Sequence, residues 1–122
     1  MDEKELHLER AKKALESAKL LQSKGFVEDA FSRAYYSLLH SGIALLVGIG
    51  ETPPKTHGGL VAKLFSSLEK LGLSREVLRR FSRFQALRES GDYAPLPAVM
   101  KSDLAEIIVF AEEFLKKAGG VK

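Results

Sequence analysis

A long run of nearly uncharged residues constrains this chain more than any other feature of its sequence. Residues 30–50 read AFSRAYYSLLHSGIALLVGIG and carry one formal charge, on Arg33, and one histidine, His40, in a protein that is 29% charged. A segment this rich in aromatic and branched apolar residues is typical of a helix buried around most of its circumference. Because an unpaired polar group on a buried helix costs about 1–3 kcal/mol, Arg33 and His40 are the first candidates for functional residues.

Length and composition predict one domain, residues 1–122, with a single hydrophobic core. The chain has no cysteine, which excludes disulfides and thiolate zinc sites. Its three histidines lie far apart in the sequence and form no close ligand cluster, so we expect no metal and no cofactor. The absence of cysteine and of a recognisable secretion signal predicts a cytoplasmic protein. The charge and the polar residues of the 30–50 segment argue against a membrane span.

Apolar residues recur at spacings of three and four along most of the chain, which predicts helices and no strands. The resulting fold class is all-α, an up-and-down bundle of four to five helices. The second of these helices is expected at the centre of the bundle or at the face of a dimer. The five expected helices cover residues 2–23, 27–47, 56–71, 75–90 and 98–118, with loops at residues 51–56 and 91–97. Ser74 is expected to cap the start of the fourth helix.

The central helix carries a polar stripe. Arg33, Tyr36, Ser37 and His40 share one face, since spacings of three, four and seven return a helix to the same side. This stripe is able to line a pocket or a two-fold interface and to hold a phosphate or a water. Equally, the arginine is able to extend to solvent while the tyrosine packs as core.

A second candidate site lies at the start of the third helix. Lys55 and His57 flank Thr56 and precede two glycines. Backbone N–H groups at a helix start bind anions, and the two side chains would assist them. The alternative is that Thr56 caps the helix and His57 bonds only to loop backbone.

A third candidate site follows the fourth helix, in the segment LRESGDYAP. Arg88 and Asp92 are able to pair if the helix continues, whereas Gly91 favours a turn that swings Asp92 and Tyr93 back over the bundle. In that position the carboxylate would orient the guanidinium beside the tyrosine hydroxyl. The alternative is a structural clasp that ties the loop to the central helix.

Three arginines form a ridge on the fourth helix. Arg75, Arg79 and Arg83 follow one another at intervals of four, on the side away from the apolar positions. Such a ridge is able to neutralise RNA phosphates, and the net charge of +3 permits an anionic partner. A solvated helix face is the alternative interpretation.

Three of these segments together resemble the HEPN domain family, in particular its small stand-alone archaeal and bacterial members. The similar segments are AFSRAYYSLLHSGIALL (30–46), KTHGGLVAKLF (55–65) and LRESGDY (87–93). The resemblance implies an all-α bundle that pairs into a symmetric dimer. It also implies that the protein functions together with a minimal nucleotidyltransferase as partner, as in toxin–antitoxin pairs. Several members of the family are metal-independent ribonucleases, and others only bind nucleotides or a partner.

The ribonuclease branch of that family carries an arginine followed, after four to six residues, by a histidine. Arg88 aligns with this arginine, but residues 93–95 are Tyr, Ala and Pro, so the histidine is missing. The general acid or base of that chemistry is therefore absent at this position. Arg33 and His40 have the required spacing, but they lie inside one helix, about 10 Å apart along its axis.

The sequence therefore predicts a homodimeric module that binds RNA or a nucleotide, with a minimal nucleotidyltransferase as partner and no membrane association. Two alternatives remain: a metal-independent endoribonuclease toxin and a non-catalytic dimeric scaffold. The toxin would use Arg33 or Arg88 with His40. The expected ligand contacts are Arg33, Tyr36, His40, Lys55, His57, Arg88, Asp92 and Tyr93, with Arg75, Arg79 and Arg83 supplying electrostatic attraction.

Overall fold

The computed structural model describes residues 2–93 and 99–119, without the side chains of His57 and of residues 91–93. In this part of the chain the fold is all-α, with six helices and no strand. The helices are α1 (Glu3–Ser23), α2 (Val27–Gly48), α3 (His57–Ser66), α4 (Leu68–Leu71), α5 (Arg75–Tyr93) and α6 (Lys101–Ala118).

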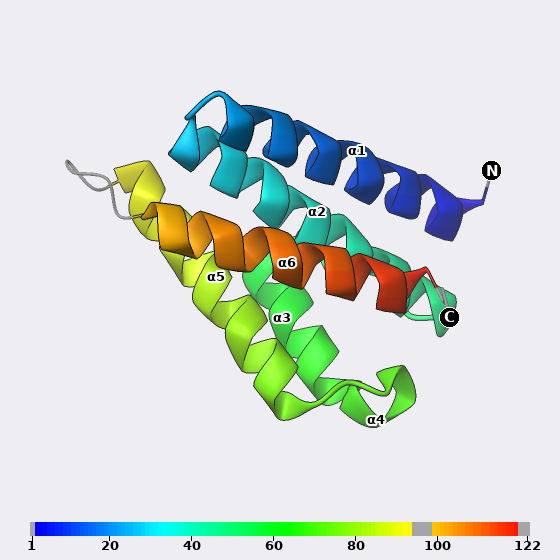
Figure 1. The fold of residues 1–122 in the computed structure, drawn as a ribbon. Coiled ribbons are helices and arrows are strands. Elements are labelled where there is room, and N and C mark those ends of the chain that lie inside the picture. The colour runs from blue at the N-terminus through cyan, green and yellow to red at the C-terminus, as the bar shows by residue number, and fades with distance from the viewer. Residues whose placement is uncertain (1, 94–98, 120–122) are drawn as a thin grey trace.

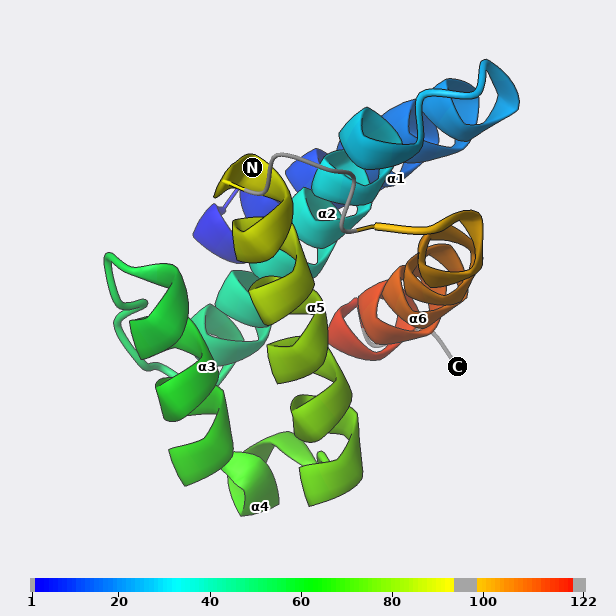
Figure 2. The same cartoon turned by 90° about the vertical axis from the view of Figure 1, so that its left-hand side faces the viewer.

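The helices are arranged in two groups. Figure 1 shows α1, α2 and α6 lying roughly lengthwise beside one another, while α3 and α5 run across them and meet at the short α4. Figure 2 shows the same crossing from the side, with α3 and α5 next to each other. Helix α2 contacts α1, α3, α5 and α6, so it is the central helix of the bundle, as its near-absence of charge predicts.

The expected count of four to five helices is wrong, because the third expected helix is divided. Its helical hydrogen bonding ends at Ser66, and Ser67 takes backbone angles of −111° and 16°, outside the helical region. The chain then turns once more as α4, up to Gly72, whose φ of 66° is the left-handed conformation that glycine adopts readily.

Two further boundaries differ from expectation. Helix α5 continues through Gly91 to Tyr93, so no turn forms at Gly91. A glycine inside a helix costs only about 1 kcal/mol relative to alanine, which is too little to end a helix by itself. Helix α6 begins at Lys101 rather than at Ala98, and residues 94–98 lie outside the described residues.

Side-chain caps fix the starts of three helices. The Gly59 N–H donates to Thr56 Oγ1 at 3.0 Å and the Val77 N–H donates to Ser74 Oγ at 3.1 Å, which confirms the caps expected from the sequence. Asp2 caps α1 in the same way by accepting from the Glu5 N–H at 2.8 Å. Each such cap stabilises its helix by about 1 kcal/mol.

Helices α1 and α2 form an antiparallel pair with small residues at their interface. Ala11 and Ala14 on α1 and Ala34 on α2 are almost completely buried. The hydroxyl of Ser37 donates to the backbone oxygen of Ala11 at 2.8 Å, in a buried hydrogen bond. This bond pairs the middle of α1 with the middle of α2, which brings the first turns of α1 beside the second half of α2.

The opposite side of α2 faces an aromatic core. Tyr35 packs edge-on against Phe81 of α5, with ring centroids 6.1 Å apart, and Phe31 packs in the same way against Phe84. Phe81 in turn contacts Phe114 of α6 at 5.4 Å. Edge-to-face pairs contribute about 0.5–1.5 kcal/mol each beyond the area that they bury, so these rings hold α2, α5 and α6 together.

No helix in the described part of the chain combines the length and the apolar character needed to cross a membrane.

Candidate functional site

Three side chains of the polar stripe touch one another along α2. The guanidinium carbon of Arg33 lies 5.0 Å from the centre of the Tyr36 ring. Tyr36 in turn meets His40 edge-on, with ring centroids 4.4 Å apart. Arg33, Tyr36 and His40 therefore lie along one face of α2, as their spacing predicts. Ser37 does not belong to this contact chain, because its hydroxyl is bound to the backbone of α1.

A second histidine, His7 on α1, completes this cluster. Its Nδ1 lies 2.8 Å from Nδ1 of His40, and the two rings stack with centroids 5.1 Å apart. A hydrogen bond between two such nitrogens requires one of them to carry a proton and the other to accept it. The place of His7 in this cluster was not predicted from the sequence, because His7 lies 33 positions from His40. The available signal was the hairpin register, since antiparallel pairing of α1 and α2 brings these positions together.

Burial keeps both histidines neutral near pH 7. Burial, together with the smaller effects of the nearby His7 and Arg10, lowers the pKa of His40 to about 4. Burial also lowers the pKa of His7, with a contribution from Arg10 and opposition from Glu3. The Nε2 atom of His40 is buried and has no hydrogen-bond partner among the described residues. A substrate therefore has no access to the nitrogen that a general base would use.

The other half of the cluster is open to solvent. Arg33 and Arg10 are exposed, and Tyr36 is 39% exposed although it sits next to a buried histidine. A guanidinium binds phosphate oxygens in pairs, and an exposed aromatic ring stacks on a nucleobase. Arg33, Tyr36 and Arg10 thus offer the chemistry of a nucleotide-binding surface, which we call the α1–α2 face.

Arg88 contacts the other tyrosine of the central helix. Its guanidinium carbon lies 5.7 Å from the centre of the Tyr35 ring, which is 1% exposed. Burial raises the pKa of Tyr35 to about 12, opposed by the charge of Arg88 and reinforced by that of Glu89. Tyr35 is therefore a neutral core residue, and Arg88, which is half-buried, lies against the core side of α2.

Two of the expected partners of Arg88 cannot be placed. The backbone of Asp92 and Tyr93 forms the last turn of α5, but their side chains lie outside the described residues. The same holds for the side chain of His57 at the start of α3. Lys55 is exposed in the loop before α3, and within the described residues it makes no polar contact with the α1–α2 face.

Two of the three arginines in the ridge on α5, Arg79 and Arg83, form ion pairs with acidic side chains. Arg83 binds Glu106 of α6 at 2.7 Å and approaches Asp103 at 3.8 Å. Arg79 lies 4.0 Å from Glu76, with both side chains largely exposed. Arg75 is the only member of the ridge without an ion pair among the described residues. The expected ridge is thus not one continuous cationic surface, because its last member joins α5 to α6.

Within residues 2–93 and 99–119, side chains that bind metals do not gather in groups of three or more. The His7–His40 pair is the nearest approach to such a cluster, and Arg10 beside it repels a cation. The cluster is therefore better suited to an anionic ligand than to a metal ion.

Comparison with known proteins gives matches along nearly the whole chain. The HEPN domain family matches residues 4–121. A UPF0332 protein of Archaeoglobus fulgidus is 37% identical over 118 residues, which are 97% of this chain and 94% of that protein. A UPF0332 protein of Thermotoga maritima is 32% identical, with 94% and 90% covered. A protein of Methanocaldococcus jannaschii named "Putative toxin MJ0142" is 30% identical, with 90% and 75% covered.

Proposed function

The chain belongs to the HEPN domain family, and on that premise we propose that it is a toxin-like module that binds RNA or a nucleotide through the α1–α2 face. Arg33 and Arg10 bind phosphate, and Tyr36 stacks on a base. His40 packs edge-on against the tyrosine ring, and His7 stacks on His40. Further contacts come from Arg88, Asp92 and Tyr93 on α5, from Lys55 before α3 and from His57 at its start, as the ligand continues across the bundle.

One observation carries this proposal: the guanidinium of Arg33 lies over a tyrosine ring that is 39% exposed. Exposed arginine and aromatic side chains in contact are the pattern by which proteins hold single-stranded nucleic acids.

The proposed biological setting is a toxin–antitoxin pair in the cytoplasm. It is supported by similarity to the M. jannaschii proteins whose names contain "Putative toxin". We propose a minimal nucleotidyltransferase as the partner protein and a homodimer as the assembly. Sedimentation of the purified chain alone, and then mixed with a nucleotidyltransferase encoded by a neighbouring gene, tests both parts.

A binding role fits the histidines better than catalysis does. The ribonuclease alternative needs a histidine that exchanges a proton with the RNA near neutral pH. His40 has its pKa lowered to about 4 by burial, and its Nε2 is inaccessible. Its Nδ1 is already engaged with His7. RNA should therefore be bound and left intact.

Fluorescence anisotropy with a labelled single-stranded RNA of about 12 nucleotides tests the proposal. We expect Arg33→Ala and Tyr36→Ala each to weaken binding about tenfold, in the range found for lost phosphate and stacking contacts. Arg79→Ala is the matched control, an exposed arginine on α5, and should change affinity less than about twofold.

Gel analysis of the same RNA, with and without EDTA, distinguishes binding from cleavage. Equal affinities for the wild-type chain and both α1–α2 variants would refute the proposed surface. Cleavage that persists in EDTA and disappears in both His40→Ala and Arg88→Ala would favour the ribonuclease alternative.

A further inference from the structure

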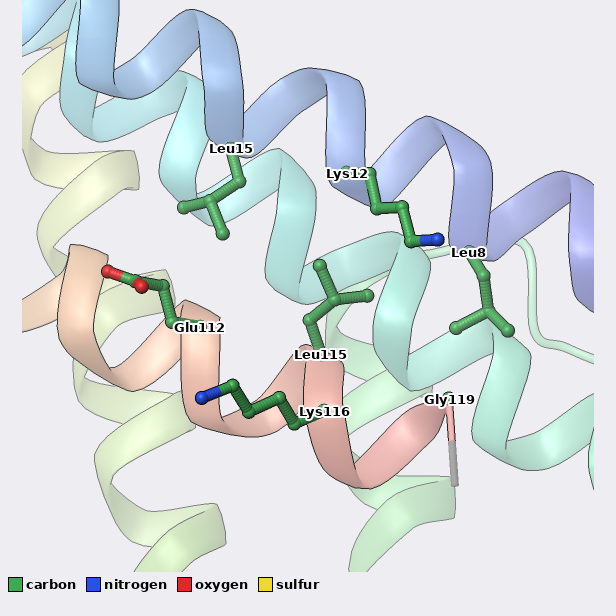
Figure 3. A pocket seen from close by; sticks show the side chains of 7 residues that line it. All are labelled: Leu8, Lys12, Leu15, Glu112, Leu115, Lys116 and Gly119. Atoms are coloured by element: carbon green, nitrogen blue, oxygen red, sulfur yellow. The ribbon is translucent and has the colours of Figure 1, made fainter. Parts of the chain in front are cut away.

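A groove separates α1 from α6 on a different side of α1 from the nucleotide-binding surface. It has a volume of about 290 Å³, and three leucines supply the apolar part of its lining, namely Leu8, Leu15 and Leu115. Figure 3 shows Leu8 and Leu15 pointing from α1 toward α6, while Leu115 rises between them from α6. Nothing in the proposed RNA-binding function uses this groove.

The apolar lining follows the geometry of two helical turns. Leu8 and Leu15 are seven positions apart on α1, so they lie on one side of that helix, about 10 Å apart along its axis. Leu8 and Leu115 are partly exposed, whereas Leu15 is buried, with 7% of its surface exposed. A trough between two antiparallel helices, with partly exposed leucines at this spacing, matches the apolar face of a third helix.

The charges at the rim of the groove are unbalanced. Lys12 extends from α1 between Leu15 and Leu8, Lys116 lies along α6 on the other side of the groove (Figure 3), and both are exposed. Neither lysine forms an ion pair within the part of the chain that the structure describes. The acidic residue of the lining, Glu112, is already held by Lys19 at 3.4 Å. The charge left for a partner is therefore positive.

From this combination we propose that the α1–α6 groove binds an acidic amphipathic helix of a partner protein. Leucines of that helix fill the space among Leu8, Leu15 and Leu115. Its flanking Glu or Asp side chains meet Lys12 and Lys116. The proposal goes beyond RNA binding and does not depend on it, because the ligand, the groove and the contact residues are different.

Two synthetic helical peptides of 14 residues test this proposal directly. Both carry leucines at positions i, i+4 and i+7, and they differ only in having either glutamates or lysines at the flanking positions. Binding to the full chain is measured by two-dimensional NMR. We expect saturable shifts of the backbone signals of Leu8, Leu15 and Leu115 with the acidic peptide, and none with the basic one.

Charge reversal provides the decisive comparison. The double variant Lys12→Glu/Lys116→Glu should weaken binding of the acidic peptide at least about tenfold and allow the basic peptide to bind. The matched control Lys13→Glu/Lys70→Glu changes two exposed lysines outside the groove, with the same change in net charge, and should leave both affinities within about twofold. Circular dichroism melts confirm that both variants are folded.

Several outcomes would overturn the proposal. One is the absence of saturable binding of the acidic peptide up to about 1 mM. Another is equal loss of affinity in the groove variant and the control. A third is occupation of the groove by dodecanoate without binding of the acidic peptide, which would identify it as a site for small amphiphiles. RNA binding is measured in parallel and should change equally in the groove variant and in its control, which have the same net charge, so the two proposals fail separately.

Discussion

Tyr35 and Tyr36 are neighbours in the sequence, yet they belong to two different regions of the molecule. Each ring has an arginine over it, Arg88 at 5.7 Å from Tyr35 and Arg33 at 5.0 Å from Tyr36. Tyr35 is 1% exposed and faces the phenylalanines of α5 and α6, whereas Tyr36 is 39% exposed and faces solvent beside His40. Consecutive residues of a helix point about 100° apart, and that rotation separates core from surface here.

The same pair of residue types therefore occurs in two different environments around one helix. In the Arg88–Tyr35 pair the arginine covers a core ring and helps to join α5 to α2. In the Arg33–Tyr36 pair both partners keep surface that a ligand is able to reach. Contact between arginine and tyrosine alone does not distinguish the proposed binding surface from the core, whereas the exposed fraction of the tyrosine ring does.

Removing each tyrosine ring in turn tests this difference between core and surface most directly. Tyr35→Ala should lower the free energy of unfolding by about 3–5 kcal/mol, as expected for a large aromatic deleted from a core. Tyr36→Ala should lower it by about 1 kcal/mol or less, since the ring is partly exposed. Urea denaturation followed by circular dichroism measures both. Similar losses for the two variants would show that Tyr36 is a core residue after all.

Lowering the pH should destabilise the folded protein through protonation of His40, which packs against Tyr36. The pKa of His40 is about 4 in the folded chain and near 6.5 when unfolded, so the unfolded state binds more protons between these values. The free energy of unfolding should therefore fall by about 2–3 kcal/mol as the pH drops from 7 to 4.

Urea denaturation across that pH range measures this dependence, and His40→Leu should flatten it. Tyr36→Phe is the control, because it keeps the ring contact with His40 and should keep the wild-type slope. A slope that is the same in His40→Leu and in the wild-type chain would show that other groups cause the acid sensitivity.

Salt dependence sharpens the contrast between the two arginines. Arg33→Gln should reduce the slope of log affinity for RNA against log salt concentration by about 1, with affinity lowered about tenfold. Arg88→Gln should reduce the slope by less than half as much, since its guanidinium is half-buried against Tyr35. Anisotropy titrations at four salt concentrations give both slopes, and a larger effect at Arg88 would move the phosphate contact to α5.

The smallest effect is expected at Arg83, the arginine tied to α6. Arg83→Ala removes its contacts with Glu106 and Asp103 and should lower the free energy of unfolding by about 0.5–1 kcal/mol. Its RNA affinity should stay within about twofold of wild type. A tenfold loss of affinity would instead restore the arginine ridge as an electrostatic surface.

The fold could largely be predicted from the sequence because the helical signals are local. The uncharged stretch at residues 30–50 predicted the central helix, and Thr56 and Ser74 predicted two helix starts that the hydrogen bonds confirm. The break at Ser67 was missed because serine is tolerated in helices and nothing in the neighbouring sequence resembles a stop.

The candidate site was predicted only where its residues share one helix. Arg33, Tyr36 and His40 follow from their spacing alone, whereas His7 depends on the pairing of α1 with α2. The ion pair between Arg83 and Glu106 of α6 could not be predicted either, because the sequence alone does not show which acidic residues of another helix will lie opposite an arginine. Predicting a contact between two helices requires their relative register, and that register is determined by how the helices pack.

The alanine-lined interface between α1 and α2 has a mechanical consequence. Methyl groups such as those of Ala11, Ala14 and Ala34 have no alternative rotamers, and the Ser37 hydroxyl locks the register at the Ala11 carbonyl. One helix therefore has no low-energy way to slide along the other. If ligand or partner binding deforms this protein, we expect α1 and α2 to move together as one unit with their register unchanged.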